Sequence, residues 1–385
     1  TAFIPASSLK TLTTATALEI LGPDFRFITE LKSTAPIQNS IIDGDLVIVG
    51  GGDPMLREAD LQNWAQKLHE SGLKTITGRI RGDGTLFPGT IYNDFWNWGD
   101  VGNGYGSGVS GLNLEHNRFL ASFDAGPSVG APATLLYTSP ALSSWIIHNE
   151  VLTAETGTGD GVVIHGGEGA APLHLRGTVP LGAKSFGVMG AAPDPVRLAE
   201  DRFSTLLRAH GRVQIEERTT KAAGESHSLL THQSPRLADI VTSIHATSDN
   251  HETECVFRML GVKAGKPPAE VIRAHWKARG LDFTVLRMVD GCGLARANVI
   301  SPHDLARLQF TAGNGPQGKE YTASLLSENG LRWKGGAMSG VRTFTGFATG
   351  KTGVSYSFAF MVNHTLNNDA VSALRQRLVA AMLSL

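Results

Sequence analysis

A serine and a lysine stand three positions apart near the start of the chain, in Pro5-Ala-Ser-Ser-Leu-Lys10. Apolar residues recur at helical spacing from Leu9 to Ile20, so we expect a helix that begins at or just before Ser7. Side chains at i and i+3 share a face of a helix, which would place the Lys10 amine beside the Ser7 hydroxyl. The helix N-terminus and a second nearby cation would favour the neutral amine, which can accept the serine proton. Alone, the same spacing also fits an N-cap serine followed by a solvated lysine.

The tripeptide Ser248-Asp249-Asn250 supplies a second hydroxyl and an amide. Apolar spacing predicts a helix that includes Leu237 and Ile244 before it, and another that runs towards Leu260 after it. The hydroxyl of Ser248 can relay a proton to a leaving amine, and the amide of Asn250 can hold a substrate carbonyl. Taken by itself, the tripeptide indicates an Asx turn that caps the following helix more strongly than it indicates a catalytic role.

The order Ser-x-x-Lys, Ser-Asp-Asn and a Lys-x-Gly strand is shared by penicillin-binding proteins and serine β-lactamases. The chain resembles the DacB-type D-alanyl-D-alanine carboxypeptidases, the class C low-molecular-mass penicillin-binding proteins of peptidase family S13. The stretches that carry the resemblance are PASSLK, LVIVGGGDPML, WNWGDVGNGYGSGVSGLN, APDP, SDNHETE, DGCGLARANVISP and FAFMVN. A long insertion between Ser7 and Ser248 is typical of this family, whereas β-lactamases place the corresponding groups much closer together.

The resemblance implies an α+β fold, a penicillin-binding or serine β-lactamase-like transpeptidase domain with helices around an antiparallel sheet and a large, mostly β insertion. We expect residues 1–40 and 232–385 to form the DD-peptidase domain. From 41 to 231 the sequence changes to short β-like runs separated by glycine-rich turns, which predicts an inserted β-rich module of one or two subdomains.

Either of two lysines near the C-terminus, Lys334 or Lys351, could be the lysine of the third motif. In this fold two strands and a helix follow the motif lysine, and only Lys334 leaves room for them: strands at 342–348 and 354–362, then a helix at 370–383. The stretch from Lys334 to Val341 also matches the family register K-T-G-T-x-x-G-V. Gly350-Lys351-Thr352-Gly353 then becomes a turn. A nucleotide-binding P-loop is excluded there because Thr345 stands where a glycine is required.

Gly335 departs from the family pattern, which has threonine or serine after the lysine. Without that hydroxyl, a charge-assisted hydrogen bond to the terminal carboxylate of the substrate is lost, at a cost of about 1.5–3 kcal/mol. Gly335, Gly336 and Ala337 are expected to lie along the substrate, with Ala337 supplying the second backbone donor of an oxyanion hole beside Ser7. The alternative function is a weakened or inactive peptidoglycan-binding scaffold.

The resemblance implies further roles outside these motifs. Asp100 is expected to meet the amino group of a diaminopimelate-containing stem peptide, with Tyr105 flanking it; a surface loop with a capping aspartate is the alternative. Asp290-Gly-Cys-Gly-Leu294 should form a tight turn that supports the site. Glu252 and Glu254 are expected to face solvent or cap their helix.

The composition of the chain limits the classes of molecule that it is expected to bind. Lys and Arg number 34 and Asp and Glu 35 in a chain of 385 residues, so no net field favours nucleic acid or an anionic membrane. No spacing suggests a metal site or a cofactor, and the two cysteines, Cys255 and Cys292, are expected to be buried thiols. The resemblance implies peptidoglycan stem peptides as substrates, β-lactams as covalent inhibitors, and a periplasmic or cell-envelope location in a bacterium. The sequence does not indicate an oligomeric state.

Overall fold

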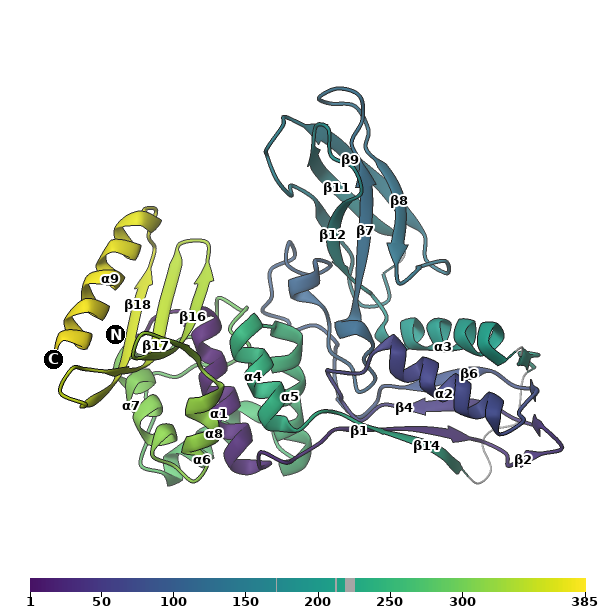
Figure 1. Cartoon of the computed structure of the whole chain (residues 1–385), viewed down its shortest axis with the longest axis horizontal. Coiled ribbons are helices and arrows are strands. Elements are labelled where there is room, and N and C mark those ends of the chain that lie inside the picture. Colours follow the sequence, from purple (N-terminus) through teal and green to yellow (C-terminus); the bar gives the residue numbers. More distant parts are fainter. Residues whose placement is uncertain (171, 212, 219–225) are drawn as a thin grey trace. The chain divides into compact units, whose positions relative to one another are not determined.

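The computed structural model describes residues 1–170, 172–211, 213–218 and 226–385 (Figure 1). Contacts divide the chain into two compact units. Unit 1 comprises Thr1–Arg26, Asn93–Trp96 and Pro235–Leu385, and unit 2 comprises Phe27–Tyr92 and Asn97–Ser234. Unit 2 begins ahead of residue 41, where the sequence placed the insertion, because strand β1 (Ile28–Ser33) pairs with β14 (His227–Gln233) and with β4 (Leu46–Val49).

Unit 1 surrounds a four-stranded antiparallel sheet with helices. The sheet order is β15-β16-β17-β18. Its elements are the 3₁₀ turn η1 (Ala6–Leu9), α1 (Lys10–Ile20), α4 (Leu237–Thr247), α5 (Asn250–Ala264), α6 (Pro268–Ala278), α7 (Pro302–Gly313), α8 (Gly318–Ser324), β15 (Leu326–Glu328), β16 (Leu331–Met338), β17 (Val341–Thr349), β18 (Ser355–Asn363) and α9 (Asn368–Ser384). In Figure 1, α9 runs along the sheet on the side opposite α1 and α7.

The two faces of this sheet carry different residues because side chains alternate along each strand. The face towards α9 is apolar: Phe344 and Phe358 pack there with Val379 and Met382 of the helix. The opposite face contacts η1. Because β15 pairs only with residues 331–333 of β16, the edge of β16 from Lys334 onward has no partner strand in this sheet.

The late strands and their turn agree with the sequence prediction. β17 covers the first predicted strand, β18 begins one residue later than the second predicted strand, and residues 350–354 join them. Gly353 has a φ of 80°, a conformation that glycine adopts without a steric penalty, and Lys351 is exposed. Lys351 is therefore a turn residue, as predicted.

Unit 2 is mostly β, with two longer helices. Its elements are β1, β2 (Ile37–Gln38), β3 (Ile41–Ile42), β4, α2 (Glu58–Glu70), β5 (Thr75–Ile76), β6 (Ile80–Asp83), η2 (Gly104–Gly106), η3 (Glu115–Asn117), β7 (Arg118–Asp124), β8 (Thr134–Ser139), β9 (Ile147–Ala154), β10 (Val163–His165), β11 (Leu173–Pro180), β12 (Phe186–Ala191), α3 (Pro195–Gly211), β13 (Gln214–Ile215) and β14. One apolar core joins α2 and α3 to the sheet strands, with Trp64 and Phe203 in edge-to-face contact. Among the described residues, no helix has the length and apolar character needed to span a membrane.

Candidate active site

Ser7 and Lys10 lie side by side at the start of the first helix. Ser7 is in the turn η1, and α1 follows directly from Lys10. Lys10 Nζ is 3.0 Å from Ser7 Oγ, so the i and i+3 side chains meet as the spacing predicted. The backbone before Ser7 is constrained, since Ala6 has a φ of 45°. The turn and the start of α1 together bring the hydroxyl next to the amine.

Lys10 is fully buried, and its amine has two further acceptors. Nζ is 2.6 Å from Asn250 Oδ1 and 2.7 Å from the carbonyl oxygen of Cys292. Burial lowers the pKa of Lys10 from its ordinary value. A neutral amine has two N–H donors and one lone pair, so the two oxygens can take the donors while the lone pair faces Ser7. This arrangement suits proton abstraction from the serine hydroxyl.

Lys334 and Ser248 form a second lysine–serine pair. Lys334 Nζ donates to Ser248 Oγ at 2.8 Å and to the carbonyl oxygen of Gly335 at 3.0 Å. Ser248 ends α4 in a left-handed conformation with a φ of 60°, which is uncommon for a non-glycine residue and points to a positional requirement. Burial, and then the charge of Lys10, lower the pKa of Lys334 to about 7.

The lowered pKa of Lys334 makes this side chain costly for the fold. Between its folded pKa of about 7 and the unfolded value of 10.5, the unfolded chain binds more protons, so this contribution to stability rises with pH across that window. We therefore expect Lys334→Met to raise the free energy of unfolding at pH 7 by about 1–3 kcal/mol, the lost hydrogen bonds offsetting part of the gain. Urea denaturation at pH 7 and pH 10 would measure this. The gain should shrink at pH 10, and a variant less stable than wild type at pH 7 would contradict the expectation.

A buried loop holds the Cys292 carbonyl against Lys10. The carboxylate of Asp290 accepts from the backbone N–H groups of Gly293 at 2.8 Å and Ala295 at 2.7 Å. Glu254 accepts from the N–H groups of Gly291 at 2.6 Å and Cys292 at 2.8 Å. The predicted supporting turn is confirmed, and the Cys292 thiol is buried and free.

The prediction that Glu252 and Glu254 face solvent or cap their helix was wrong, because both are buried. The cap of α5 is Asp249, which accepts from the backbone N–H of Glu252 at 2.9 Å. Burial and then the charge of Asp290 raise the pKa of Glu254 to about 7. Glu254, Asp290 and Cys292 offer ligand atoms within 4.8 Å of one another, but both carboxylates already bind backbone N–H groups. Their chemistry therefore fits loop positioning better than metal binding.

His245 is a further buried residue that sequence reasoning missed. Its two ring nitrogens lie 2.9 Å from Thr14 Oγ1 and 2.9 Å from Ser324 Oγ. Burial lowers its pKa to about 3, so the ring is neutral and ties α4 to α1 and α8. This support fixes the helix end that carries Ser248. A lone histidine on an apolar helix face gives no sequence signal of such a role.

Two adjacent glycines in β16 face opposite sides of the sheet. A Cβ at Gly336 would lie 2.7 Å from Ser7 N and 2.8 Å from Ser8 N, so only glycine permits this approach. A Cβ at Gly335 would meet Trp333 at 3.2 Å and no backbone atom closer than 3.8 Å. Gly336 is thus required by packing, whereas nothing comparable requires Gly335.

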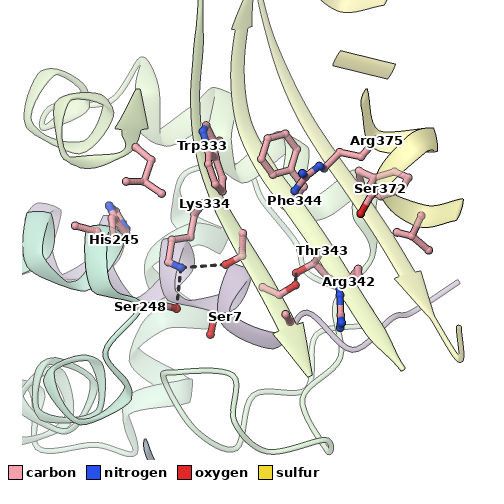
Figure 2. Close-up of a pocket in the computed structure, with 17 residues that line it drawn as sticks. Ser7, His245, Ser248, Trp333, Lys334, Arg342, Thr343, Phe344, Ser372 and Arg375 are labelled. Atoms are coloured by element: carbon pink, nitrogen blue, oxygen red, sulfur yellow. Dashed lines mark hydrogen bonds between the residues drawn. The ribbon is translucent and has the colours of Figure 1, made fainter. Parts of the chain in front are cut away.

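A cavity of about 510 Å³ brings the predicted residues of unit 1 together (Figure 2). Its lining includes Ser7, His245, Ser248, Trp333, Lys334, Gly335, Gly336, Ala337, Arg342, Thr343, Phe344, Ser372 and Arg375. Lys10 Nζ contacts Ser7 Oγ, and Asn250 Oδ1 contacts the same amine. The cavity is lined from both faces of β16, so it extends around the unpaired edge of that strand.

Asp100 and Tyr105 belong to unit 2. Tyr105 donates through its hydroxyl to Asp100 Oδ1 at 3.0 Å, and Asn97 Nδ2 donates to the other carboxylate oxygen at 3.0 Å. Burial and this hydrogen bond raise the pKa of Tyr105 to about 12. The two residues form a pair on an exposed loop, and their contact with substrate stays a prediction.

Sequence comparisons connect this chain to known enzymes. A model of the D-Ala-D-Ala carboxypeptidase 3 (S13) family matches residues 1–327. The chain is 26% identical to a D-alanyl-D-alanine carboxypeptidase of Actinomadura sp. (strain R39), over 91% of this chain and 71% of that protein. It is 25% identical to the D-alanyl-D-alanine carboxypeptidase DacB of Haemophilus influenzae, over 97% of this chain and 83% of that protein.

Structural comparison supports the fold. The crystal structure of penicillin-binding protein 4 (DacB) from Haemophilus influenzae matches with a TM-score of 0.81 at 21% identity, covering 98% of this chain and 92% of that one. Bd3459, a predatory peptidoglycan endopeptidase from Bdellovibrio bacteriovorus, matches with a TM-score of 0.52 at 13% identity, covering 99% and 85%. The predicted α+β, penicillin-binding fold is therefore confirmed.

Proposed function

Because the chain belongs to the D-Ala-D-Ala carboxypeptidase 3 (S13) family of serine-type peptidases, we propose that it removes the terminal D-alanine from peptidoglycan stem peptides through an acyl-enzyme on Ser7. The observation that carries the proposal is the contact of two buried lysines with two serines in one cavity: Lys10 with Ser7, and Lys334 with Ser248. Burial lowers the pKa of Lys10, which favours a neutral amine able to accept a proton, and the pKa of Lys334, lowered to about 7, suits proton transfer near neutral pH.

The reaction begins when Ser7 Oγ attacks the carbonyl carbon of the penultimate D-alanine. Lys10 takes the serine proton, and the carbonyl π electrons move to oxygen to form a tetrahedral oxyanion. Backbone N–H groups of Ser7 and Ala337 are the proposed donors to that oxyanion. As the C–N bond breaks, Ser248 passes a proton to the departing amine and is reprotonated by Lys334. Water, deprotonated by an amine of the site, then cleaves the ester and regenerates Ser7.

The same chemistry predicts two further reactions. A β-lactam presents a strained amide to Ser7, and the resulting ester would hydrolyse slowly, so β-lactams would act as covalent inhibitors. If cross-linked stem peptides enter the cavity, the attack cleaves the cross-link and the enzyme is also an endopeptidase. Because peptidoglycan is the proposed substrate, the proposed location is the periplasm or cell envelope of a bacterium. The Asp100–Tyr105 pair is proposed to bind the amino group of the stem peptide.

The test is D-alanine release by the wild-type protein from a synthetic stem pentapeptide ending in D-Ala-D-Ala, followed by mass spectrometry. A pentapeptide ending in D-Ala-L-Ala serves as the matched control and should stay intact. Benzylpenicillin should add once to the protein, on the tryptic peptide that contains Ser7 and ends at Lys10. A folded protein that releases no D-alanine and forms no adduct would overturn the proposal and favour the non-catalytic scaffold, for which Gly335 is the argument.

A further inference from the structure

One face of β16 carries neither a hydroxyl nor a charged side chain beside the cavity. Gly335 and Ala337 point to the same face as Trp333, and both line the cavity that contains Ser7. Across the strand pair, Gly335 lies opposite Phe344 and Ala337 opposite Arg342. A substrate aligned along this edge would find neither a hydroxyl nor a charge on β16 itself for its terminal carboxylate.

Cationic side chains reach the same face from neighbouring elements. Arg342 of β17 and Arg375 of α9 both line the cavity. In the part of the chain that the structure describes, neither guanidinium forms an ion pair with a carboxylate. Arg342 Nη1 donates to the carbonyl oxygens of Met338 and Val341 at 2.8 Å each, which holds it at the hairpin end.

Arg375 differs from Arg342 in its contacts. Its guanidinium carbon lies 5.3 Å from the centroid of the Phe344 ring, and Figure 2 shows the two side by side. Phe344 is the cross-strand neighbour of Gly335, so the guanidinium stands on the face where a side chain at residue 335 would project. Ser372, one turn earlier on α9, also lines the cavity.

We infer that Arg375 is a specificity-determining residue that binds the C-terminal carboxylate of the substrate from α9, in place of a hydroxyl on β16. This inference rests on the proposed function, because it concerns a peptide that ends in a free carboxylate. The planar fork of a guanidinium matches a carboxylate with two parallel hydrogen bonds. Stacking on Phe344 orders the side chain before binding, and Gly335 leaves room for the carboxylate between strand and helix.

Binding to the Ser7→Ala protein tests the inference without requiring turnover. Calorimetry would compare a stem pentapeptide ending in D-Ala-D-Ala with its C-terminal amide, in Ser7→Ala and in the same protein with Arg375→Gln, Arg342→Gln or Arg377→Gln. Arg377 is an exposed arginine of the same helix that does not line the cavity. The acid should bind more tightly than the amide, and Arg375→Gln should weaken the acid alone by about tenfold.

Three outcomes would overturn the inference: equal affinity for acid and amide, an equal loss for both ligands in Arg375→Gln, or a selective loss in Arg342→Gln instead. Acylation of the Ser7-containing proteins by benzylpenicillin separates this inference from the proposed function. Adducts on wild type with no effect of Arg375→Gln on acid binding would reject Arg375 alone. Preference for the acid without any adduct or D-alanine release would reject the catalytic function and retain the carboxylate site.

Discussion

The Ser7→Ala variant is expected to form no adduct with benzylpenicillin, whereas Ser8→Ala should still form one. The two serines are adjacent, yet the structure gives them different surroundings. Ser7 Oγ faces the amine of Lys10 at 3.0 Å and lines the cavity. Ser8 is fully buried, and its hydroxyl is 2.8 Å from Thr343 Oγ1. Only the first has both a base and access to a ligand, which a nucleophile requires.

Intact-mass spectrometry of both variants after incubation with benzylpenicillin would measure this difference. Removing the Ser8 hydroxyl leaves Thr343 Oγ1 with the carbonyl oxygen of Pro5 at 2.7 Å, so the cost should appear as a loss of stability of about 1 kcal/mol. Thermal unfolding would show it. An adduct on Ser7→Ala that maps to Ser8 would show that the nucleophile had been assigned to the wrong residue.

Sequence patterns brought out the candidate site because its motifs are local. The spacing of Ser7 and Lys10 depends on the period of a helix. The choice of Lys334 over Lys351 rests on the strands and helix that follow the motif lysine in the family that the chain resembles. The buried position of Glu254 was not predictable in this way. It follows from a loop, 290–295, that folds back on α5 and supplies the backbone N–H groups that a buried carboxylate needs.

The surroundings of Gly335 on β16 were likewise not predictable from local sequence patterns. From the sequence alone, Gly335 indicates only that the hydroxyl of the family's threonine or serine is missing at this position. The structure adds the register that pairs Gly335 with Phe344 and the helix that brings Arg375 over that ring. Contacts of this kind join residues distant in sequence, so no local period encodes them. The functional effect of a substitution within a motif, such as Gly335, can therefore be judged only when the elements packed around it are known.

The Lys10→Met variant is expected to be acylated by benzylpenicillin about 10²- to 10⁴-fold more slowly, because a positioned general base contributes about this factor to the rate. Methionine keeps most of the volume and removes the amine. In the wild type, burial lowers the pKa of Lys10, so more of the amine is neutral at a given pH than in a solvated lysine. As pH rises through the lowered pKa, the fraction of neutral Lys10 rises, and wild-type acylation should rise with it.

Stopped-flow or quenched-flow mass spectrometry between pH 5 and pH 9 would record both effects, with Lys351→Met as the matched control. Lys351 is exposed in the turn at 350–353 and contributes nothing to the cavity lining, so its variant should match the wild type at every pH. Lys10→Met should lose the rise that comes from deprotonation of Lys10, whereas the titration of Lys334, with a pKa of about 7, remains in the variant. If Lys10→Met retained the rate while Lys351→Met lost it, the base would have to lie on the β17–β18 turn, and the pairing of Lys10 with Ser7 would have only a structural role.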